Sequence, residues 1–361
     1  GWGGTLVQIQ HWPITGRSLA GRQRSDPCRF PERLHRASKS SRYFSLLRET
    51  SNSFKLSTPS LQPMVAGKPN STFLKSPVKN AAPNSYRGRI APTPTGRLHE
   101  GHAKTFWTAR ERVIAAEGRL ILRIEDLDLP RCKPEFVEGC IEDLIWFGFD
   151  WHEGPDKVGQ HAPYYQSKRT DIYRSTLETL IEKGHVYRCY CSRKDIEQAT
   201  RAPHAAEDEL IYPGTCRSNH DQKKNPSSRN QYCWRFKVPR GISICFQDGQ
   251  LGMCEFKAEK HFGDFVVWRA DSIPSYQLAV TVDDHLMNIS EVVRGEDLII
   301  STARQLLLYE ALEWEPPSFY HCPLVLDEKG QRLAKRHQSL SLRALRESEK
   351  TPEQIRAGWN K

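Results

Sequence analysis

Apolar and polar positions follow a regular pattern only from Tyr86 onward. Short apolar runs predict strands over 87–91 and 119–124, and apolar residues spaced three to four apart predict helices over 102–117, 135–147 and 169–183. Pro134 near the start of the second helix, and Gly148 and Gly184 after the second and third, are typical helix boundaries. Strands that alternate with helices predict an α/β fold: a doubly wound parallel sheet that binds its ligand at the carboxyl ends of the strands.

A second regular region follows an interruption. Strands are predicted over 262–269 and 274–282, and an amphipathic helix over 302–312. Between the two regions the chain consists of short strands, loops and cysteines, which predicts an insertion that splits one nucleotide-binding domain. The predicted organisation is a leader at 1–82, a first half-domain at 83–184, an insertion at 185–260, a second half-domain at 261–346 and a short tail at 347–361.

The leader differs in composition from the rest of the chain. Residues 1–82 carry thirteen Lys and Arg but only three Asp and Glu, and they show no sustained periodicity. This predicts a segment without a fold, with the composition of a plastid or mitochondrial transit peptide. Because the first methionine is Met64, translation that starts there would instead give a cytoplasmic protein. The chain has no apolar run long enough for a membrane span, so we expect no membrane partner.

Charge outside the leader is balanced. Residues 83–361 contain forty basic and forty acidic side chains, so the net charge of +10 belongs entirely to the leader. A nucleic acid that binds the folded part must therefore contact a local basic face.

The most informative stretch is Arg89–His102, with the sequence RIAPTPTGRLHEGH. It runs from the end of a predicted strand through a Pro- and Gly-rich turn into a helix. Backbone N–H groups at such a helix N-terminus bind phosphate. Gly101 allows close approach of the backbone, and His99 and His102 can donate to phosphate oxygens as negative charge develops.

This stretch resembles the HIGH signature of class I aminoacyl-tRNA synthetases, in the form used by the glutamyl/glutaminyl branch. Further matches to that family are RIEDLD at 123–128, SYQLAVTVDD at 275–284, RGED at 294–297 and RQLLLY at 304–309. RLAKR at 332–336 stands in the place of the family's KMSKS loop, with Arg332 for the first lysine and Ala334 for the serine. The resemblance implies a Rossmann-like, HUP-type catalytic domain over residues 86–346, and the two replacements predict slower chemistry.

The resemblance also implies a reaction. ATP activates a carboxylate to an acyl-adenylate, with Mg²⁺ bridging phosphates, and tRNA then accepts the acyl group. The implied ATP contacts are His99, Gly101, His102 and Lys335, of which the two histidines and the lysine are catalytic. The implied amino-acid site consists of Arg89, Ala91, Thr93, Glu125, Tyr276 and Arg294. Two arginines suit carboxylates and Glu125 suits an α-ammonium group, which favours L-glutamate.

The predicted insertion contains a candidate zinc site. Cys189, Cys191 and Cys216 can supply three thiolates to a tetrahedral Zn²⁺. Resemblance to the short, truncated relatives implies Tyr212 as the fourth ligand, whereas His204 and His220 are chemically more ordinary alternatives. Five other cysteines lie among apolar neighbours and are predicted to be small buried hydrophobic residues: Cys132, Cys140, Cys245, Cys254 and Cys322.

The acceptor is the remaining question. Only twenty-five residues follow Arg336, whereas a discriminating glutamyl-tRNA synthetase continues into an anticodon-binding domain. That pattern resembles the glutamyl-queuosine tRNA(Asp) synthetases, which transfer glutamate to queuosine in the anticodon loop. Two alternatives stay open: ordinary charging of tRNA(Glu) by an incomplete sequence, and a catalytically silent tRNA-binding module. We expect a monomer in each case.

Overall fold

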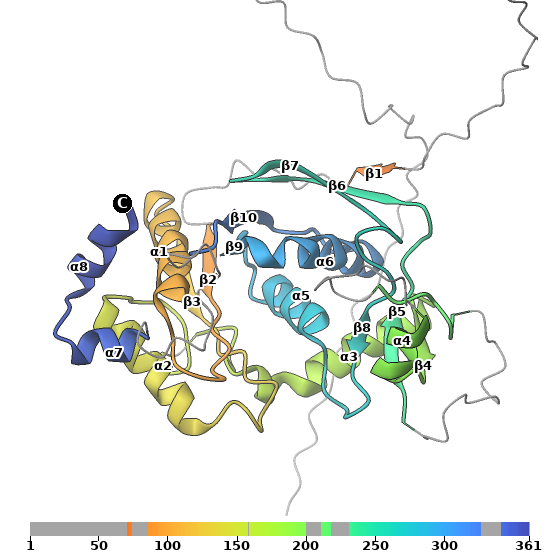
Figure 1. Cartoon of the computed structure of the whole chain (residues 1–361), viewed down its shortest axis with the longest axis horizontal. Coiled ribbons are helices and arrows are strands. Elements are labelled where there is room, and N and C mark those ends of the chain that lie inside the picture. Colours follow the sequence, from red (N-terminus) through yellow and green to blue (C-terminus); the bar gives the residue numbers. More distant parts are fainter. Residues whose placement is uncertain are drawn as a thin grey trace, which may run out of the picture. The chain divides into compact units, whose positions relative to one another are not determined.

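Parallel strands form the centre of the protein. The computed structural model describes residues 71–73, 86–157, 159–199, 211–217, 231–325 and 341–360. Strand β2 (Arg87–Ile90) pairs in parallel with β3 (Arg119–Leu122), and β9 (Glu291–Gly295) pairs in parallel with β10 (Ser318–Cys322). The Ser290 N–H donates to the Arg87 carbonyl at 3.0 Å, so β2 runs beside β9. The predicted parallel α/β sheet is confirmed (Figure 1).

The predicted helices of the first half-domain are present. They are α1 (Glu100–Ala115), α2 (Pro134–Phe147) and α3 (Thr170–Glu182), the last preceded by a 3-10 turn, η1 (Gln166–Arg169). Gly148 and Gly184 follow α2 and α3 with φ of 95° and 72°, a backbone conformation that favours glycine. In the second half-domain, α6 (Ile299–Leu312) begins three residues before the predicted helix.

One predicted strand is wrong. Residues 274–282 are predicted to be extended, but residues 276–282 belong to helix α5 (Tyr276–Leu286). Ser275 caps this helix, since its Oγ accepts from the Leu278 N–H. Every residue from Leu278 to Asp284 is buried, so the sequence shows no polar face from which a 3.6-residue period could be read. The strand predicted over 262–269 is shorter, β8 (Val266–Trp268).

The predicted insertion divides into two parts. Strands β4 (Val186–Cys189) and β5 (Cys233–Phe236) form an antiparallel sheet with β8, and α4 (Arg193–Ala199) follows β4. Strands β6 (Ser243–Asp248) and β7 (Gly252–Lys257) form a hairpin, and β6 pairs in parallel with β10. The central sheet therefore resumes at β6, ahead of the expected boundary at residue 261.

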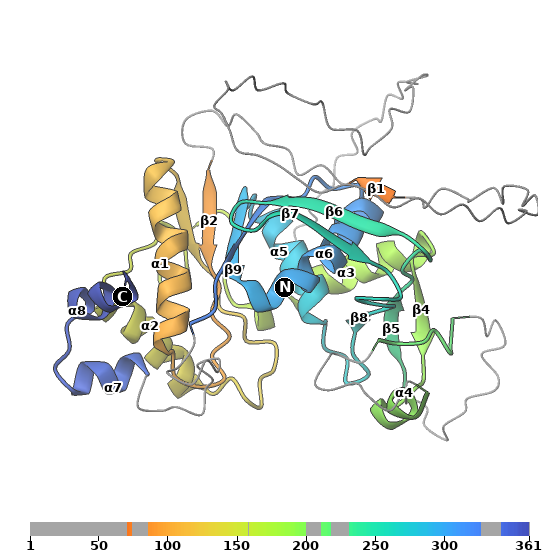
Figure 2. The same cartoon turned by 45° about the horizontal axis from the view of Figure 1, so that its top comes forward.

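The two ends of the chain also hold regular structure. A short strand, β1 (Ser71–Phe73), pairs in parallel with β6, inside the segment expected to lack a fold. The rest of the leader lies outside the described residues, and its role in targeting stays a prediction. The expected tail contains α8 (Pro352–Ala357) and η4 (Gly358–Asn360), which follow α7 (Leu342–Glu347). Figure 2 shows α7 and α8 beside α1 and α2.

Two hydrophobic clusters support the sheet. One joins β2 and β3 to α1, α2, α7 and α8, and the other joins β6, β9 and β10 to α3, α5 and α6. Four of the five cysteines predicted to be buried are buried, whereas Cys254 is half-exposed. Among the described residues, no helix combines the length and the apolar character that crossing a membrane requires.

Candidate active site

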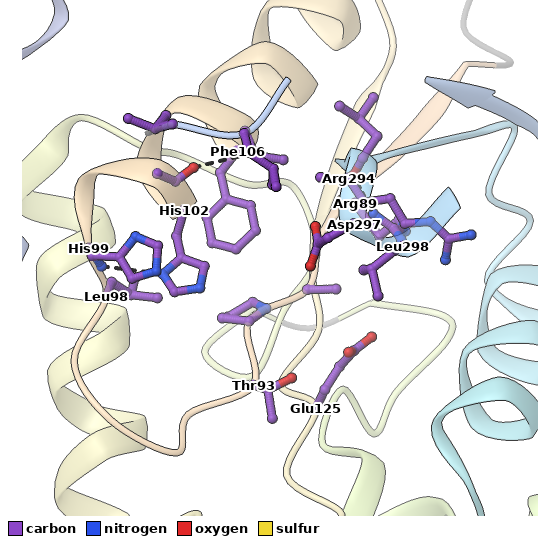
Figure 3. A pocket seen from close by; sticks show the side chains of 18 of the residues that line it. Arg89, Thr93, Leu98, His99, His102, Phe106, Glu125, Arg294, Asp297 and Leu298 are labelled. Atoms are coloured by element: carbon purple, nitrogen blue, oxygen red, sulfur yellow. Dashed lines mark hydrogen bonds between the residues drawn. The ribbon is translucent and has the colours of Figure 1, made fainter. Parts of the chain in front are cut away.

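A pocket of about 380 Å³ lies at the carboxyl ends of the parallel strands. Every residue predicted to bind ATP or the amino acid lines it, except Lys335, namely Arg89, Ala91, Thr93, His99, Gly101, His102, Glu125, Tyr276 and Arg294. Lys335 and the rest of the 332–336 motif lie outside the described residues. Figure 3 shows His99, His102 and Phe106 on one side of the pocket and Arg89, Arg294 and Leu298 on the other.

Backbone pairing beyond the strands brings these residues together. The Arg123 N–H donates to the Ile90 carbonyl at 2.9 Å, and the Glu125 N–H donates to the Pro92 carbonyl at 3.0 Å. Residues 91–93 therefore lie beside 123–125. Tyr276 opens α5 and Arg294 is the penultimate residue of β9. Ligand sites of doubly wound sheets form where strand ends meet in this way.

The two histidines lie at the N-terminus of α1. His99 is the N-cap residue, and its backbone N–H donates to His102 Nδ1 at 3.3 Å. A neutral His102 that accepts at Nδ1 carries its proton on Nε2, which makes Nε2 a donor suitable for a phosphate oxygen. A Cβ atom on Gly101 would lie 3.1 Å from both Cε1 and Nδ1 of His99. A side chain at this position would therefore push the His99 ring out of its place by a few tenths of an ångström.

Arg123 is a fully buried guanidinium behind the pocket. It contacts three carboxylates, Asp284 at 2.8 Å, Glu125 at 3.1 Å and Asp283 at 3.7 Å. Burial raises the pKa of Glu125, and the nearby positive charges of Arg123 and Arg89 oppose that shift. The sequence identified Arg123 only as part of a motif, and its place at the centre of this cluster was missed.

The other members of the cluster hold Asp283 and Asp284 inside α5. Arg169 Nε donates to Asp283 at 2.7 Å, and the Tyr173 hydroxyl donates to it at 2.8 Å. Arg89 Nε lies 3.4 Å from Asp284 Oδ1. The cluster comprises Arg89, Arg123, Arg169, Glu125, Asp283 and Asp284, and its formal charges cancel.

Arg294 brings a second guanidinium to the pocket, beside that of Arg89. Within the described part of the chain, no carboxylate lies within ion-pair distance of its guanidinium. Its Nη2 donates to Thr302 Oγ1 at 2.7 Å, its Nε to His321 Nε2 at 3.2 Å and its Nη1 to the Tyr276 hydroxyl at 3.3 Å. A guanidinium has five N–H groups, so each terminal nitrogen keeps one donor for a ligand. Sequence reasoning missed Thr302 and His321, for which no local pattern gave a signal.

The thiols of the predicted zinc site lie together in the insertion. The Sγ atoms of Cys189, Cys191 and Cys216 are all within 4.8 Å of one another. The Tyr212 hydroxyl lies 3.4 Å from Cys189 Sγ and 3.5 Å from Cys191 Sγ. Ligand atoms around a tetrahedral zinc lie about 3.5–3.8 Å apart, given Zn–S and Zn–O bonds of about 2.3 and 2.0 Å. This donor set fits Zn²⁺, whereas the alternatives His204 and His220 lie outside the described residues.

Cys233 is an additional thiol beside this group. It lies directly opposite Cys189 in the β4–β5 ladder. A hydrogen bond from the Cys233 thiol lowers the pKa of Cys189, against the effect of burial. The sequence did not single out Cys233, because its proximity to Cys189 depends on strand register.

Comparison with known proteins identifies the family. Residues 85–360 match the family described as tRNA synthetases class I (E and Q), catalytic domain. The chain belongs to this family of class I aminoacyl-tRNA synthetases.

The chain is similar to three curated relatives in particular. It is 45% identical over 263 residues to the glutamyl-Q tRNA(Asp) synthetase of Nitratidesulfovibrio vulgaris, covering 72% of this chain and 81% of that protein. It is also 45% identical over 271 residues to the glutamyl-Q tRNA(Asp) synthetase of Symbiobacterium thermophilum, covering 74% and 83%. The glutamate–tRNA ligase of Myxococcus xanthus is 40% identical over 291 residues, covering 77% and 59%.

The chain is also similar in structure to a solved member of this family. The crystal structure of a glutamate tRNA ligase from Elizabethkingia meningosepticum, in complex with its amino acid, matches with a TM-score of 0.61 and 33% identity. The match covers 70% of this chain and 52% of that chain.

Proposed function

We propose that the protein activates L-glutamate with ATP and transfers it to tRNA, with queuosine in the anticodon loop of tRNA(Asp) as the acceptor. In the first step a glutamate α-carboxylate oxygen attacks the α-phosphate of ATP, which forms glutamyl-adenylate and releases pyrophosphate. The observation that carries the proposal is the pocket, which combines a helix N-terminus bearing His99 and His102 with an amino-acid site at Arg89, Glu125 and Arg294. ATP is a substrate here, and Mg²⁺ would bind its phosphates.

His99 and His102 act on the phosphates. Each imidazole can donate to an oxygen that gains charge as the bond to pyrophosphate breaks, and the α1 N-terminus adds its dipole. Lys335, in the predicted loop, would contribute a further positive charge to the leaving pyrophosphate. No side chain needs to act as a nucleophile, because the substrate carboxylate is the nucleophile.

Charge selects the amino acid. Glu125 accepts the α-ammonium group, and Arg294 offers one unused donor on each terminal nitrogen to a carboxylate. Glutamine cannot neutralise the charge of Arg294, and aspartate is shorter by one methylene. ATP–pyrophosphate exchange should therefore respond to glutamate and respond at least about tenfold less to glutamine or aspartate. Comparable exchange with glutamine would refute this assignment.

The relatives support queuosine as the acceptor. Identity is 45% to the two glutamyl-Q tRNA(Asp) synthetases, over 81% and 83% of their lengths. Ordinary charging of tRNA(Glu) is the second candidate, supported by the 40% identity to a glutamate–tRNA ligase. A silent tRNA-binding module is the weakest, because the predicted substrate-binding residues converge in one pocket.

A stem-loop substrate separates these candidates. The tRNA(Asp) anticodon stem-loop carrying queuosine is incubated with enzyme, ATP and labelled glutamate. The matched control is the same stem-loop with guanosine in place of queuosine. Labelling of the first and not the second supports the proposal. Labelling of neither, with efficient charging of full-length tRNA(Glu), would establish the second candidate, and no exchange or transfer with any substrate would establish the third.

We further propose that Cys189, Cys191, Cys216 and Tyr212 hold one structural Zn²⁺. The hydroxyl-to-sulfur distances of 3.4 and 3.5 Å fit the edges of a tetrahedron, which leaves no position open for catalysis. Metal analysis should find about one zinc per chain, and none after Cys189→Ser. Cys254→Ser is the control, since this half-exposed thiol lies outside the group. If Tyr212→Phe retains the metal at full affinity, Tyr212 is not the fourth ligand.

A further inference from the structure

A hydrogen-bonded chain leads from the β6–β7 hairpin to the pocket. Asp248 lies at the end of β6, and its Oδ2 is 2.6 Å from Nδ1 of His321 on β10. His321 Nε2 in turn lies 3.2 Å from Arg294 Nε. His321 is fully buried, and the exposed fraction of Asp248 is 1%. The three residues come from three different strands of the central sheet.

The donors and acceptors in this chain fix the state of His321. Arg294 can only donate, so His321 Nε2 must be the acceptor. The ring proton then resides on Nδ1 and is donated to Asp248. Burial lowers the pKa of His321, and although the hydrogen bond to Asp248 opposes this shift, the neighbouring Arg294 reinforces it, so the pKa is below its usual value and the ring is neutral. A protonated ring would direct an N–H toward the guanidinium and break the contact.

Asp248 is itself held firmly. Its Oδ1 accepts from the backbone N–H groups of Leu251 at 2.9 Å and Gln250 at 3.0 Å in the hairpin turn. Although burial alone would raise it, the pKa of Asp248 is below its usual range because of the hydrogen bonds from His321 and these backbone groups. Asp248 therefore stays ionised and keeps the His321 proton on Nδ1.

We propose that His321, oriented by Asp248, is a positioning residue that aims Arg294 at the carboxylate of the amino-acid substrate. The Nε contact to His321 and the Nη2 contact to Thr302 hold the plane of the guanidinium from one side. The remaining donors of the two terminal nitrogens are then presented as a pair, the geometry that a carboxylate binds most strongly. This assignment rests on the proposed activation of glutamate, because it concerns the recognition of that substrate.

The test compares two substitutions at His321. Leu removes the acceptor at similar volume, whereas Gln places an amide oxygen near the original Nε2 position. For His321→Leu we expect the glutamate Kd from calorimetry and the KM for glutamate in pyrophosphate exchange to rise at least about tenfold. The KM for ATP should change less than about twofold, because His321 does not line the pocket and contacts only the Arg294 side of the site. His321→Gln should recover most of the glutamate affinity.

Two further variants complete the test, one as a control for stability and one as a second probe of Arg294. His285→Gln is the matched histidine substitution, since the His285 ring stacks on Trp314 with centroids 3.9 Å apart. It should lower the melting temperature without changing the Kd for glutamate. Thr302→Val removes the other acceptor for Arg294 at constant shape and should weaken glutamate binding in the same way as His321→Leu. This variant tests the same clamp if His321→Leu fails to fold.

The outcomes distinguish a failure of the proposed function from a failure of the positioning role of His321. If the wild-type protein shows no response to glutamate, the proposed function fails. If the wild type binds glutamate and His321→Leu binds it within about twofold of the wild-type affinity, the positioning role alone is refuted. The same result for Thr302→Val refutes it where His321→Leu does not fold. Equal losses for the Leu and Gln variants would also refute it, because the acceptor at Nε2 would then not be the cause.

Discussion

Removing the buried guanidinium of Arg123 should destabilise the protein strongly. In Arg123→Met, Asp283 keeps three partners, Arg169, Tyr173 and Gln166. Among the described residues, Asp284 keeps only Arg89, at 3.4 Å, as an ion-pair partner, and Glu125 keeps none. Taking away one partner of a buried ion pair typically costs about 3–5 kcal/mol. We therefore expect the free energy of unfolding to fall by about 3–5 kcal/mol near neutral pH.

The loss of stability caused by Arg123→Met should be smaller at low pH than at neutral pH. Burial already raises the pKa of Glu125, so the folded protein holds that proton to a higher pH than the unfolded chain does. Without Arg123, the pKa of Glu125 rises further, because a positive charge that opposes the effect of burial is lost. At low pH the Glu125 carboxyl is neutral and burying it costs less. The stability difference between wild type and variant should thus shrink as the pH falls from about 8 to about 5.

Urea unfolding followed by tryptophan fluorescence measures this difference. Arg131→Met is the matched control, because Arg131 also pairs with an aspartate, Asp128, but 71% of its side chain is exposed. An exposed pair contributes at most about 1 kcal/mol. If Arg123→Met costs no more than Arg131→Met, or if its cost grows as the pH falls, the electrostatic account of this cluster is wrong.

The other predictions concern the nucleotide site, the metal and the C-terminal residues. Gly101→Ala should lower kcat of pyrophosphate exchange roughly tenfold or more with little change in melting temperature, because the new Cβ displaces the His99 ring. Gly96→Ala is the control and should match wild type, since its Cβ would have nothing within 4 Å. If Gly101→Ala is as active as Gly96→Ala, the steric argument is wrong. A zinc chelator should lower the melting temperature of the wild-type protein but leave that of Cys189→Ser unchanged; the same response in both would show that the metal lies elsewhere. Trp359→Ala should lower the free energy of unfolding, measured in urea, by about 3 kcal/mol. The reason is that this ring stacks on Phe147 with centroids 5.7 Å apart and its Nε1 donates to Glu100 at 2.8 Å. A decrease below about 0.5 kcal/mol would show that residues 358–360 do not stabilise the fold.

The sequence by itself determined most of the local elements and which residues line the pocket. Gly148 and Gly184 predicted two helix ends because glycine tolerates the positive φ found there. The stretch Arg89–His102 predicted the turn and the helix that form one side of the pocket. These features depend on interactions between residues close together in the chain, which a pattern can show.

Only the tertiary structure decided what depends on distant contacts. Residues 276–282 are predicted to be a strand, yet they form a helix that Ser275 caps and whose residues 278–284 are all buried. The ion pairs of Arg123 with Asp283 and Asp284 join the residue that follows β3 to α5, and His321 reaches Arg294 only because β10 lies beside β9. Register likewise sets Cys233 against Cys189. Such neighbours are separated by tens to more than a hundred residues in the sequence. Their proximity follows from the packing of the sheet, and no local periodicity shows which strands become adjacent.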